Sequence, residues 1–134
     1  MRKKSEGFRH DAHSVGLATV HLVFVPKRRK PVLKGPVRTR LNEIFQSVAI
    51  DKKWIVRSVK IAPDHVHLLI EYDSKTSVAE VARAFKGRSS RYLRKEFPHL
   101  LKLPSLWPRS YFYETTGKVS TAKIEAYIND PHHW

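Results

Sequence analysis

The residues best suited to do chemistry lie in the segment Asp64-His65-Val66-His67, where one apolar residue separates two histidines. Side chains alternate along a strand, so both imidazoles would point to one face, ~7 Å apart, and could bind one cation. Spacing alone also fits two half-exposed histidines on an amphipathic strand, which is the more common situation for so short a pattern. The pair is therefore a candidate metal site, and the rest of the chain must decide between the two interpretations.

Tyr127 is the candidate nucleophile among the five tyrosines. Ile124 and Ile128 mark the apolar stripe of a predicted helix, and Tyr127 lies at the boundary of this stripe, where its hydroxyl can face a cleft. The same position suits a tyrosine that only packs. The remaining tyrosines are weaker candidates: Tyr92 is predicted on the buried stripe of its helix, Tyr72 at a strand end, and Tyr111 and Tyr113 on a short strand.

The charge balance predicts a polyanionic partner. The chain has 26 Lys and Arg residues against 12 Asp and Glu residues, a formal net charge of +14. Nucleic acid is the leading candidate, an anionic membrane surface is second, and a merely solvated surface is third. Two basic clusters supply the candidate DNA contacts: Lys27, Arg28 and Arg29 in one loop, and Lys86, Arg88, Arg91 and Arg94 on one helix.

Several other classes of protein do not fit the composition. Without cysteine the chain has no disulfides and no thiolate metal site. No stretch approaches the ~20 apolar residues of a membrane span, and no apolar run follows the basic start as in a signal peptide. No Gly-rich phosphate loop is found, so no nucleotide cofactor is expected. We expect a soluble, cytoplasmic protein.

Strands and helices in the order β-α-β-β-α-β-α are predicted to position these residues. Strands are expected over 15–25, 54–61, 65–72 and 111–113, and helices over 36–51, 77–97 and 120–128. The first six elements give an α+β, ferredoxin-like (RRM-like) core, an antiparallel four-stranded sheet with two helices on one face. The last helix carries Tyr127. Residues 1–134 are interpreted as one domain, with 1–14 as a loose arm.

Local signals add detail to the second helix and the core. Ser77 followed by Glu80 predicts a capping box. Trp107 is expected in the core, and His21 is expected to be structural. The buried stripe of the second helix is predicted to consist of Val78, Val81, Ala82, Phe85, Tyr92 and Leu93.

The chain also resembles a known family. Residues 64–69, Asp-His-Val-His-Leu-Leu, are similar to the signature of the HUH (His-hydrophobe-His) nucleases. More narrowly, they resemble the TnpA-type single-tyrosine HUH transposases of the smallest bacterial insertion sequences. Four further segments resemble, in order, the family's first strand with its basic turn, central helix, last strand and terminal helix: 19–29, 85–91, 106–112 and 124–128.

The resemblance implies a DNA transposase that is a metal-dependent, single-strand endonuclease. Tyr127 occupies the position of the catalytic tyrosine, which would form a 5′-phosphotyrosine and release a 3′-OH. His65 and His67 would hold Mg²⁺ or Mn²⁺, which polarises the scissile phosphate. The implied partners are single-stranded DNA with hairpin ends and a second copy of the chain in a homodimer, acting on the prokaryotic nucleoid.

One position departs from the family's pattern. The family completes its metal site with a polar residue, typically Gln, one helical turn after the tyrosine, and this chain has Pro131 there. Asp130 is the predicted third ligand, because carboxylate oxygen suits Mg²⁺ or Mn²⁺. Three weaker substitutes remain: Asn129, His132 and His133. The alternative function is a catalytically impaired or repurposed hairpin DNA- or RNA-binding module of the same fold.

Overall fold

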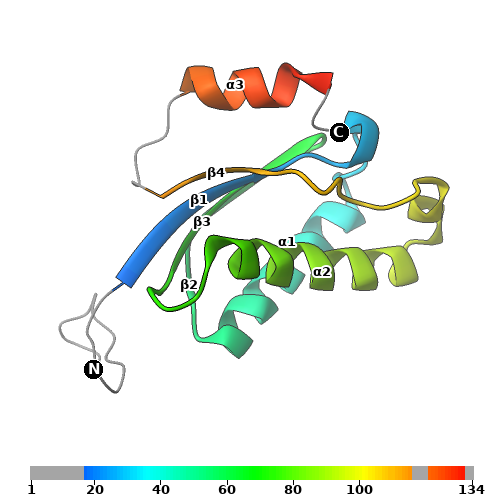
Figure 1. Cartoon of the computed structure of the whole chain (residues 1–134). Coiled ribbons are helices and arrows are strands. Elements are labelled where there is room, and N and C mark those ends of the chain that lie inside the picture. The colour runs from blue at the N-terminus through cyan, green and yellow to red at the C-terminus, as the bar shows by residue number, and fades with distance from the viewer. Residues whose placement is uncertain (1–16, 116–120, 132–134) are drawn as a thin grey trace.

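A four-stranded antiparallel sheet forms the centre of the computed structural model, which describes residues 17–115 and 121–131. The strand order is β2-β3-β1-β4 (Figure 1). The strands are β1 (Leu17–Phe24), β2 (Ile55–Ala62), β3 (His65–Asp73) and β4 (Phe112–Glu114). This order and the alternation of strands and helices confirm the α+β, ferredoxin-like prediction.

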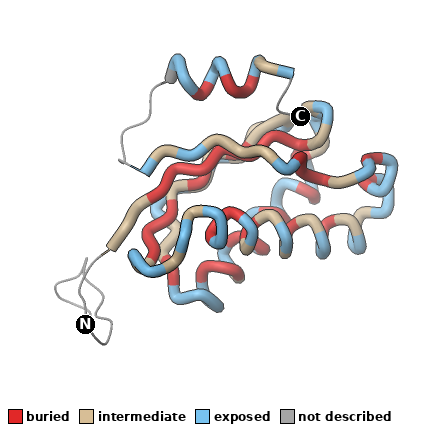
Figure 2. Tube along the Cα trace, in the orientation of Figure 1, coloured by how far each residue is buried: buried red, intermediate tan, exposed pale blue. Residues whose placement is uncertain are grey.

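Two helices, α1 (Pro36–Lys52) and α2 (Val78–Glu96), cover one face of this sheet. Most side chains of β1 and β3 that point to this face are fully buried between sheet and helices: Val20, Leu22, Phe24, Val66, Leu68 and Ile70. The trace in Figure 2 is red where residues are buried, along both strands and on the helices. Trp107 belongs to this core, as predicted. The largest contributors are Leu22, Phe24, Leu41, Ile44, Phe45, Leu68, Ile70, Phe85 and Leu93.

The starts of both helices follow from local sequence. Ser77 Oγ accepts a hydrogen bond from the Glu80 backbone N–H, and the Glu80 carboxylate accepts one from the Ser77 N–H, which confirms the capping box. Pro36 opens α1, where its fixed φ suits the first turn. Gly35 precedes it with a φ of +59°, a region that glycine enters without steric cost.

A third helix, α3 (Thr121–Asn129), lies against the opposite face of the sheet (Figure 1). Its apolar side chains Ile124, Tyr127 and Ile128 pack on Val23 and Val25 of the first strand and its extension. Tyr127 is only 7% exposed, so it lies within the buried stripe of α3 and not at its boundary. The sheet is therefore covered on both faces.

One detail of the second helix needs correction. Tyr92 is 37% exposed and is not on the buried stripe of α2; Ser89 is buried there instead, one turn before Leu93. The stretch between α2 and β4, for which no regular element is predicted, contains a short 3-10 helix at Pro98–Lys102. The proposed arm 1–14 lies outside the described residues. In the part of the chain that is described, no helix is long and apolar enough to cross a membrane.

Candidate active site

The two histidines of the motif share the face of the sheet that α3 covers. Along β3, Val66 and Leu68 are buried on the α1/α2 side, so the alternating side chains His65 and His67 point the other way. Their ring centroids lie 5.1 Å apart at an interplanar angle of 79°. The prediction that both imidazoles share one face of a strand is confirmed.

A third histidine, His21, lies beside His67 on the neighbouring strand. His21 Nε2 and His67 Nδ1 are 3.4 Å apart, and the rings stack with centroids separated by 5.3 Å. Burial lowers the pKa of His67 to about 4, assisted by the charges of His65, His21 and Lys60. Burial also lowers the pKa of His21, against a raising effect of Glu114. His67 is thus uncharged at neutral pH, the state in which imidazole binds a metal.

Asp64 fixes the orientation of His65. His65 Nδ1 donates to Asp64 Oδ1 at 2.9 Å, and Arg29 Nε donates to the other carboxylate oxygen at 2.8 Å. Burial raises the pKa of the Asp64 carboxyl, but the hydrogen bonds from Arg29 and His65 outweigh it, so the pKa lies below its ordinary value. With Nδ1 engaged, the Nε2 atom of His65 is the one left for a ligand.

Tyr127 comes to the same face through α3. It packs against the ring of Phe112, with centroids 6.1 Å apart, and its hydroxyl lies 3.4 Å from Ser110 Oγ. Burial raises the pKa of Tyr127, and the hydrogen bond with Ser110 acts in the opposite direction. The cross-strand partner of His67 in the β1–β3 register is Val23, which packs in the cluster that contains Tyr127. Tyrosine and histidines therefore lie on one face of the sheet within one chain.

Within 17–115 and 121–131, the histidine pair provides two of the donors that the predicted metal site requires. The donor set fits a divalent cation at two positions, because the Nδ1 atoms of His65 and His67 are engaged and their Nε2 atoms remain. No group of three or more His, Asp or Glu side chains within 17–115 and 121–131 is arranged to hold a metal. Asp130 is half-buried after the end of α3 and stays a prediction as third ligand. The alternatives His132 and His133 lie outside the described residues.

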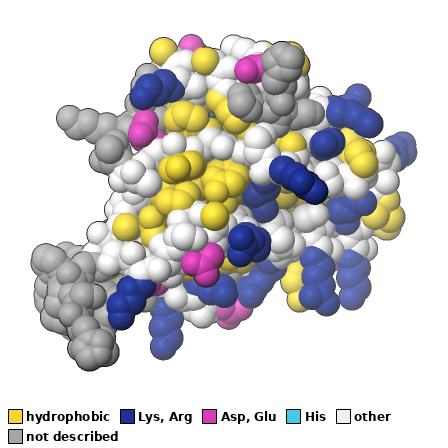
Figure 3. Space-filling model, in the orientation of Figure 1, with side chains coloured by type: hydrophobic (Ala, Val, Ile, Leu, Met, Phe, Trp, Pro, Cys, Tyr) yellow, Lys and Arg dark blue, Asp and Glu magenta, His cyan; other side chains and the backbone are white. Residues whose placement is uncertain are grey.

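The four basic residues predicted on α2 lie on the far side of the sheet from the histidines, and three of them, Lys86, Arg88 and Arg94, are engaged within the protein. Figure 3 shows Lys and Arg side chains over the half of the molecule that α1 and α2 form. Arg88 pairs with Asp51 at 2.6 Å. Arg94 donates to the backbone carbonyl of Leu103 at 2.8 Å. Arg91 is exposed, so it is the better placed of these for a phosphate.

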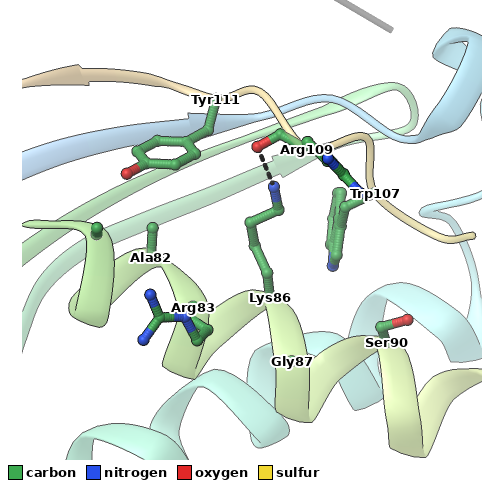
Figure 4. Close-up of a pocket in the computed structure, with 9 residues that line it drawn as sticks. Ala82, Arg83, Lys86, Gly87, Ser90, Trp107, Arg109 and Tyr111 are labelled. Carbon is green, nitrogen blue, oxygen red and sulfur yellow. Dashed lines mark hydrogen bonds between the residues drawn. The ribbon is translucent and has the colours of Figure 1, made fainter.

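Lys86 differs most from the expectation of a surface cation. Figure 4 shows its side chain rising from α2 between Trp107 and Tyr111. The ammonium donates to the carbonyl oxygens of Pro108 at 2.6 Å, Arg109 at 3.2 Å and Ser110 at 3.4 Å. Burial lowers the pKa of this lysine to about 8. These contacts hold the segment that carries Ser110 against the helix.

The sequence matches the family described as "Transposase IS200 like" over residues 14–131. The chain belongs to the IS200-like transposase family. It is 32% identical over 120 residues to the transposase of insertion sequence element IS200 from Salmonella typhimurium, covering 87% of this chain and 78% of that protein. It is 31% identical over 115 residues to the ISDra2 transposase TnpA of Deinococcus radiodurans, covering 84% and 82%. The family resemblance of the sequence is confirmed, and with it a DNA-processing enzyme of transposition.

Solved structures agree with the fold of an IS200-like transposase. A crystal structure of a Deinococcus radiodurans protein described as a transposase superposes with a TM-score of 0.83 at 29% identity, covering 94% of this chain and 99% of that one. A REP-associated tyrosine transposase, solved bound to a REP hairpin, shares the fold with a TM-score of 0.52 at 14% identity, over 90% and 67% of the two chains.

Sequence reasoning missed several residues around this transposase site. The sequence predicts only a structural role for His21, although its alternation with the buried Val20 and Leu22 places it on the face of the sheet that bears His65 and His67. Asp64 was noted only as part of the motif. No sequence signal pointed to Ser110, because its contact with Tyr127 joins two elements 17 residues apart.

Proposed function

We propose that this IS200-like transposase cleaves and rejoins single-stranded DNA at the hairpin-bearing ends of its insertion sequence, with Tyr127 as nucleophile and His65 and His67 as ligands of Mg²⁺ or Mn²⁺. The observation that supports the proposal most is that Tyr127, His65 and His67 lie on the same face of the sheet. Val23 is the cross-strand partner of His67 and packs in the cluster that contains Tyr127. Family membership supplies the reaction class.

The proposed reaction needs no energy cofactor. The Tyr127 oxygen forms a bond to phosphorus as the bond from phosphorus to the 3′ oxygen breaks. The tyrosine loses one proton, and the departing 3′ oxygen gains one to become the 3′-OH. A 3′-OH from another strand then attacks the phosphotyrosine, the bond to the tyrosine oxygen breaks, and a new phosphodiester forms. One phosphodiester is exchanged for another through the protein.

The protein's own residues prepare the two partners of this reaction. Asp64 holds His65 by its Nδ1 atom, and His21 approaches the Nδ1 atom of His67, so the Nε2 atoms are the ones that would bind a ligand. A bound divalent cation would supply charge neutralisation at the scissile phosphate. Ser110 is positioned to donate to the phenolate form of Tyr127, which favours the nucleophilic state.

The direct test is covalent adduct formation. The protein is incubated with Mg²⁺ or Mn²⁺ and a labelled single-stranded oligonucleotide that folds into a hairpin from its own element's end. We expect an adduct that survives denaturing electrophoresis and is lost in Tyr127→Phe. Tyr92→Phe is the matched control, because Tyr92 is exposed on α2, across the sheet from the histidines. If wild type binds the hairpin but forms no adduct with either metal, the binding-module alternative is correct.

The assembly of the enzyme is part of the proposal. We expect a homodimer by the family resemblance, and light scattering of the purified chain measures it. In the described residues, α3 packs on the sheet of its own chain. Mixing a Tyr127→Phe chain with a His65→Ala chain tests whether tyrosine and histidines of different copies act together: recovery of adduct formation on mixing demonstrates a shared site.

A further inference from the structure

Arg29 joins the two halves of the candidate active site. Its Nε atom donates to Asp64 Oδ2 at 2.8 Å, and its Nη1 atom donates to Asn129 Oδ1 at 3.1 Å. Asp64 precedes the histidine motif, whereas Asn129 is the last residue of α3, two positions after Tyr127. One guanidinium therefore bridges segments that lie 35 and 100 residues away from it in the chain.

We infer that Arg29 is a positioning residue of the transposase. It acts as a clasp, a side chain that binds Asp64 and Asn129 together and so keeps α3, which carries Tyr127, in a fixed position relative to His65. The inference rests on the proposed function for its catalytic consequence. It goes beyond that function because it assigns to Arg29 a role inside the protein, where the sequence predicted only a contact with DNA.

The contact between Arg29 and Asp64 affects the orientation of His65. The Asp64 carboxylate accepts from Arg29 through one oxygen and from His65 Nδ1 through the other. Asp64 is therefore held between two donors, and the His65 ring cannot rotate about χ2 without losing its hydrogen bond. Because these bonds involve charged partners, they are stronger and shorter than neutral ones. Arg29 thus fixes the orientation of His65 through Asp64.

The contact between Arg29 and Asn129 holds the end of α3. The end of α3 is tied through this side chain to the loop after β1, and the apolar packing of Ile124 and Ile128 holds the body of the helix. The planar guanidinium presents its N–H groups in a fixed fork, so Arg29 can serve Asp64 and Asn129 at once. A lysine ammonium at the end of a flexible chain has no such fork.

The backbone conformation around Arg29 indicates that the surrounding structure fixes where its side chain points. Arg28 and Arg29 have φ values of +59° and +54°, a left-handed conformation that non-glycine residues rarely adopt. The loop is held by hydrogen bonds from the Lys27 N–H to the Leu106 carbonyl and from the Arg29 N–H to the Pro26 carbonyl, both 2.8 Å. Such conformations persist where the surrounding structure fixes them, and they are frequent at functional sites.

The competing role is the predicted phosphate contact. A phosphate contact requires only a positive charge, so Arg29→Lys would preserve it, whereas a clasp requires the fork and would be lost in Arg29→Lys as in Arg29→Gln. A phosphate contact would also leave α3 unaffected in the absence of DNA. These two differences separate the roles.

The first experiment is hydrogen exchange of the α3 amides in the full-length protein without DNA. We expect exchange to accelerate about tenfold in Arg29→Gln, Arg29→Lys and Asn129→Ala, the ratio expected for one hydrogen bond to a charged group. Arg40→Gln is the matched control: Arg40 makes ion pairs with Glu96 and Glu43 on the helical side of the sheet, so α3 should exchange as in wild type.

The second experiment measures the rate of covalent adduct formation at saturating DNA. We expect the same three variants to be slower than wild type, and the Arg29→Gln/Asn129→Ala double variant to be no slower than Arg29→Gln, because both changes break one contact. The inference is overturned if Arg29→Lys matches wild type in exchange and rate, or if α3 exchanges equally in all variants. Absence of an adduct in wild type would refute the proposed function instead, and the exchange data would still decide whether Arg29 holds α3.

Discussion

His67 lies against His21 on the neighbouring strand, with 3.4 Å between His67 Nδ1 and His21 Nε2 and with the two rings stacked. When Nδ1 of His67 is the donor in this contact, Nε2 carries no proton and is the nitrogen that can bind a cation. His21 is thus placed as the outer partner of one candidate ligand, and Asp64 as the outer partner of the other.

Replacing His21 with phenylalanine keeps a buried ring but removes the nitrogen that faces His67. We expect the affinity for Mn²⁺ to fall by about 10- to 100-fold, the usual effect of losing an outer-shell partner. Titration calorimetry with Mn²⁺ measures it. His99→Phe is the control, because His99 is exposed beyond α2. Equal affinities in His21→Phe and wild type would show that His21 only fills space.

The pH dependence of cleavage should report on the contact between Ser110 and Tyr127. Burial raises the pKa of Tyr127, and the Ser110 hydrogen bond opposes this effect. In Ser110→Ala the pKa should rise further, so at a given pH less phenolate is present. We expect the ascending limb of the pH profile for adduct formation to move to higher pH. Ser105→Ala, which removes a hydroxyl from the same connecting segment, should leave the profile in place; a shift in both variants would contradict this role for Ser110.

Lys86 is expected to stabilise the folded protein. Lys86→Met keeps an unbranched apolar chain as long as the lysine's four-carbon stem, but leaves the carbonyl groups of Pro108, Arg109 and Ser110 without their ammonium donor. We expect the free energy of unfolding to fall by about 1–3 kcal/mol, the cost of leaving buried polar groups unsatisfied. Urea denaturation measures the difference. A variant as stable as wild type would show that the three hydrogen bonds are replaced by water.

Arg91 is expected to act in DNA binding. Its side chain is exposed on α2 and lies over the ring of Tyr92. If it contacts a phosphate, Arg91→Gln should reduce the slope of log affinity against log salt concentration by about 1. Arg40→Gln removes the same charge from a guanidinium that already pairs with Glu96, and its slope should stay closer to that of wild type. Fluorescence anisotropy with a labelled hairpin, repeated over a range of salt concentrations, provides both slopes.

The elements were predictable because their signals are local. The Ser77–Glu80 capping box, the alternation around His65 and the apolar spacing of α1 depend on residues a few positions apart, and all of them are found in the structure. The family resemblance then indicated which residues on these elements are candidates for catalysis, namely His65, His67 and Tyr127. The structure accordingly has His65 and His67 on one strand and Tyr127 on the last helix, while their roles in catalysis stay predictions.

The contacts around the site were not predictable, because they are set by tertiary packing. Lys86, Arg88 and Arg29 all appeared as surface cations, yet each is bound by groups far away in the chain. A long side chain can reach carbonyls or carboxylates across several ångströms, so its partner depends on which segments the fold brings together. Tyr92 was misplaced for a related reason: an aromatic ring at the edge of a helical stripe can lie on either side of the boundary.

The central claim is that Tyr127 attacks DNA from the face of the sheet that bears His65 and His67. The most direct measurement is mass spectrometry of the protease-digested covalent adduct formed with a hairpin-bearing oligonucleotide. The account predicts that the nucleotide, linked through its 5′-phosphate, is found on the peptide that contains Tyr127. A nucleotide attached to Tyr111 or Tyr113, or linked through a 3′-phosphate, would contradict it.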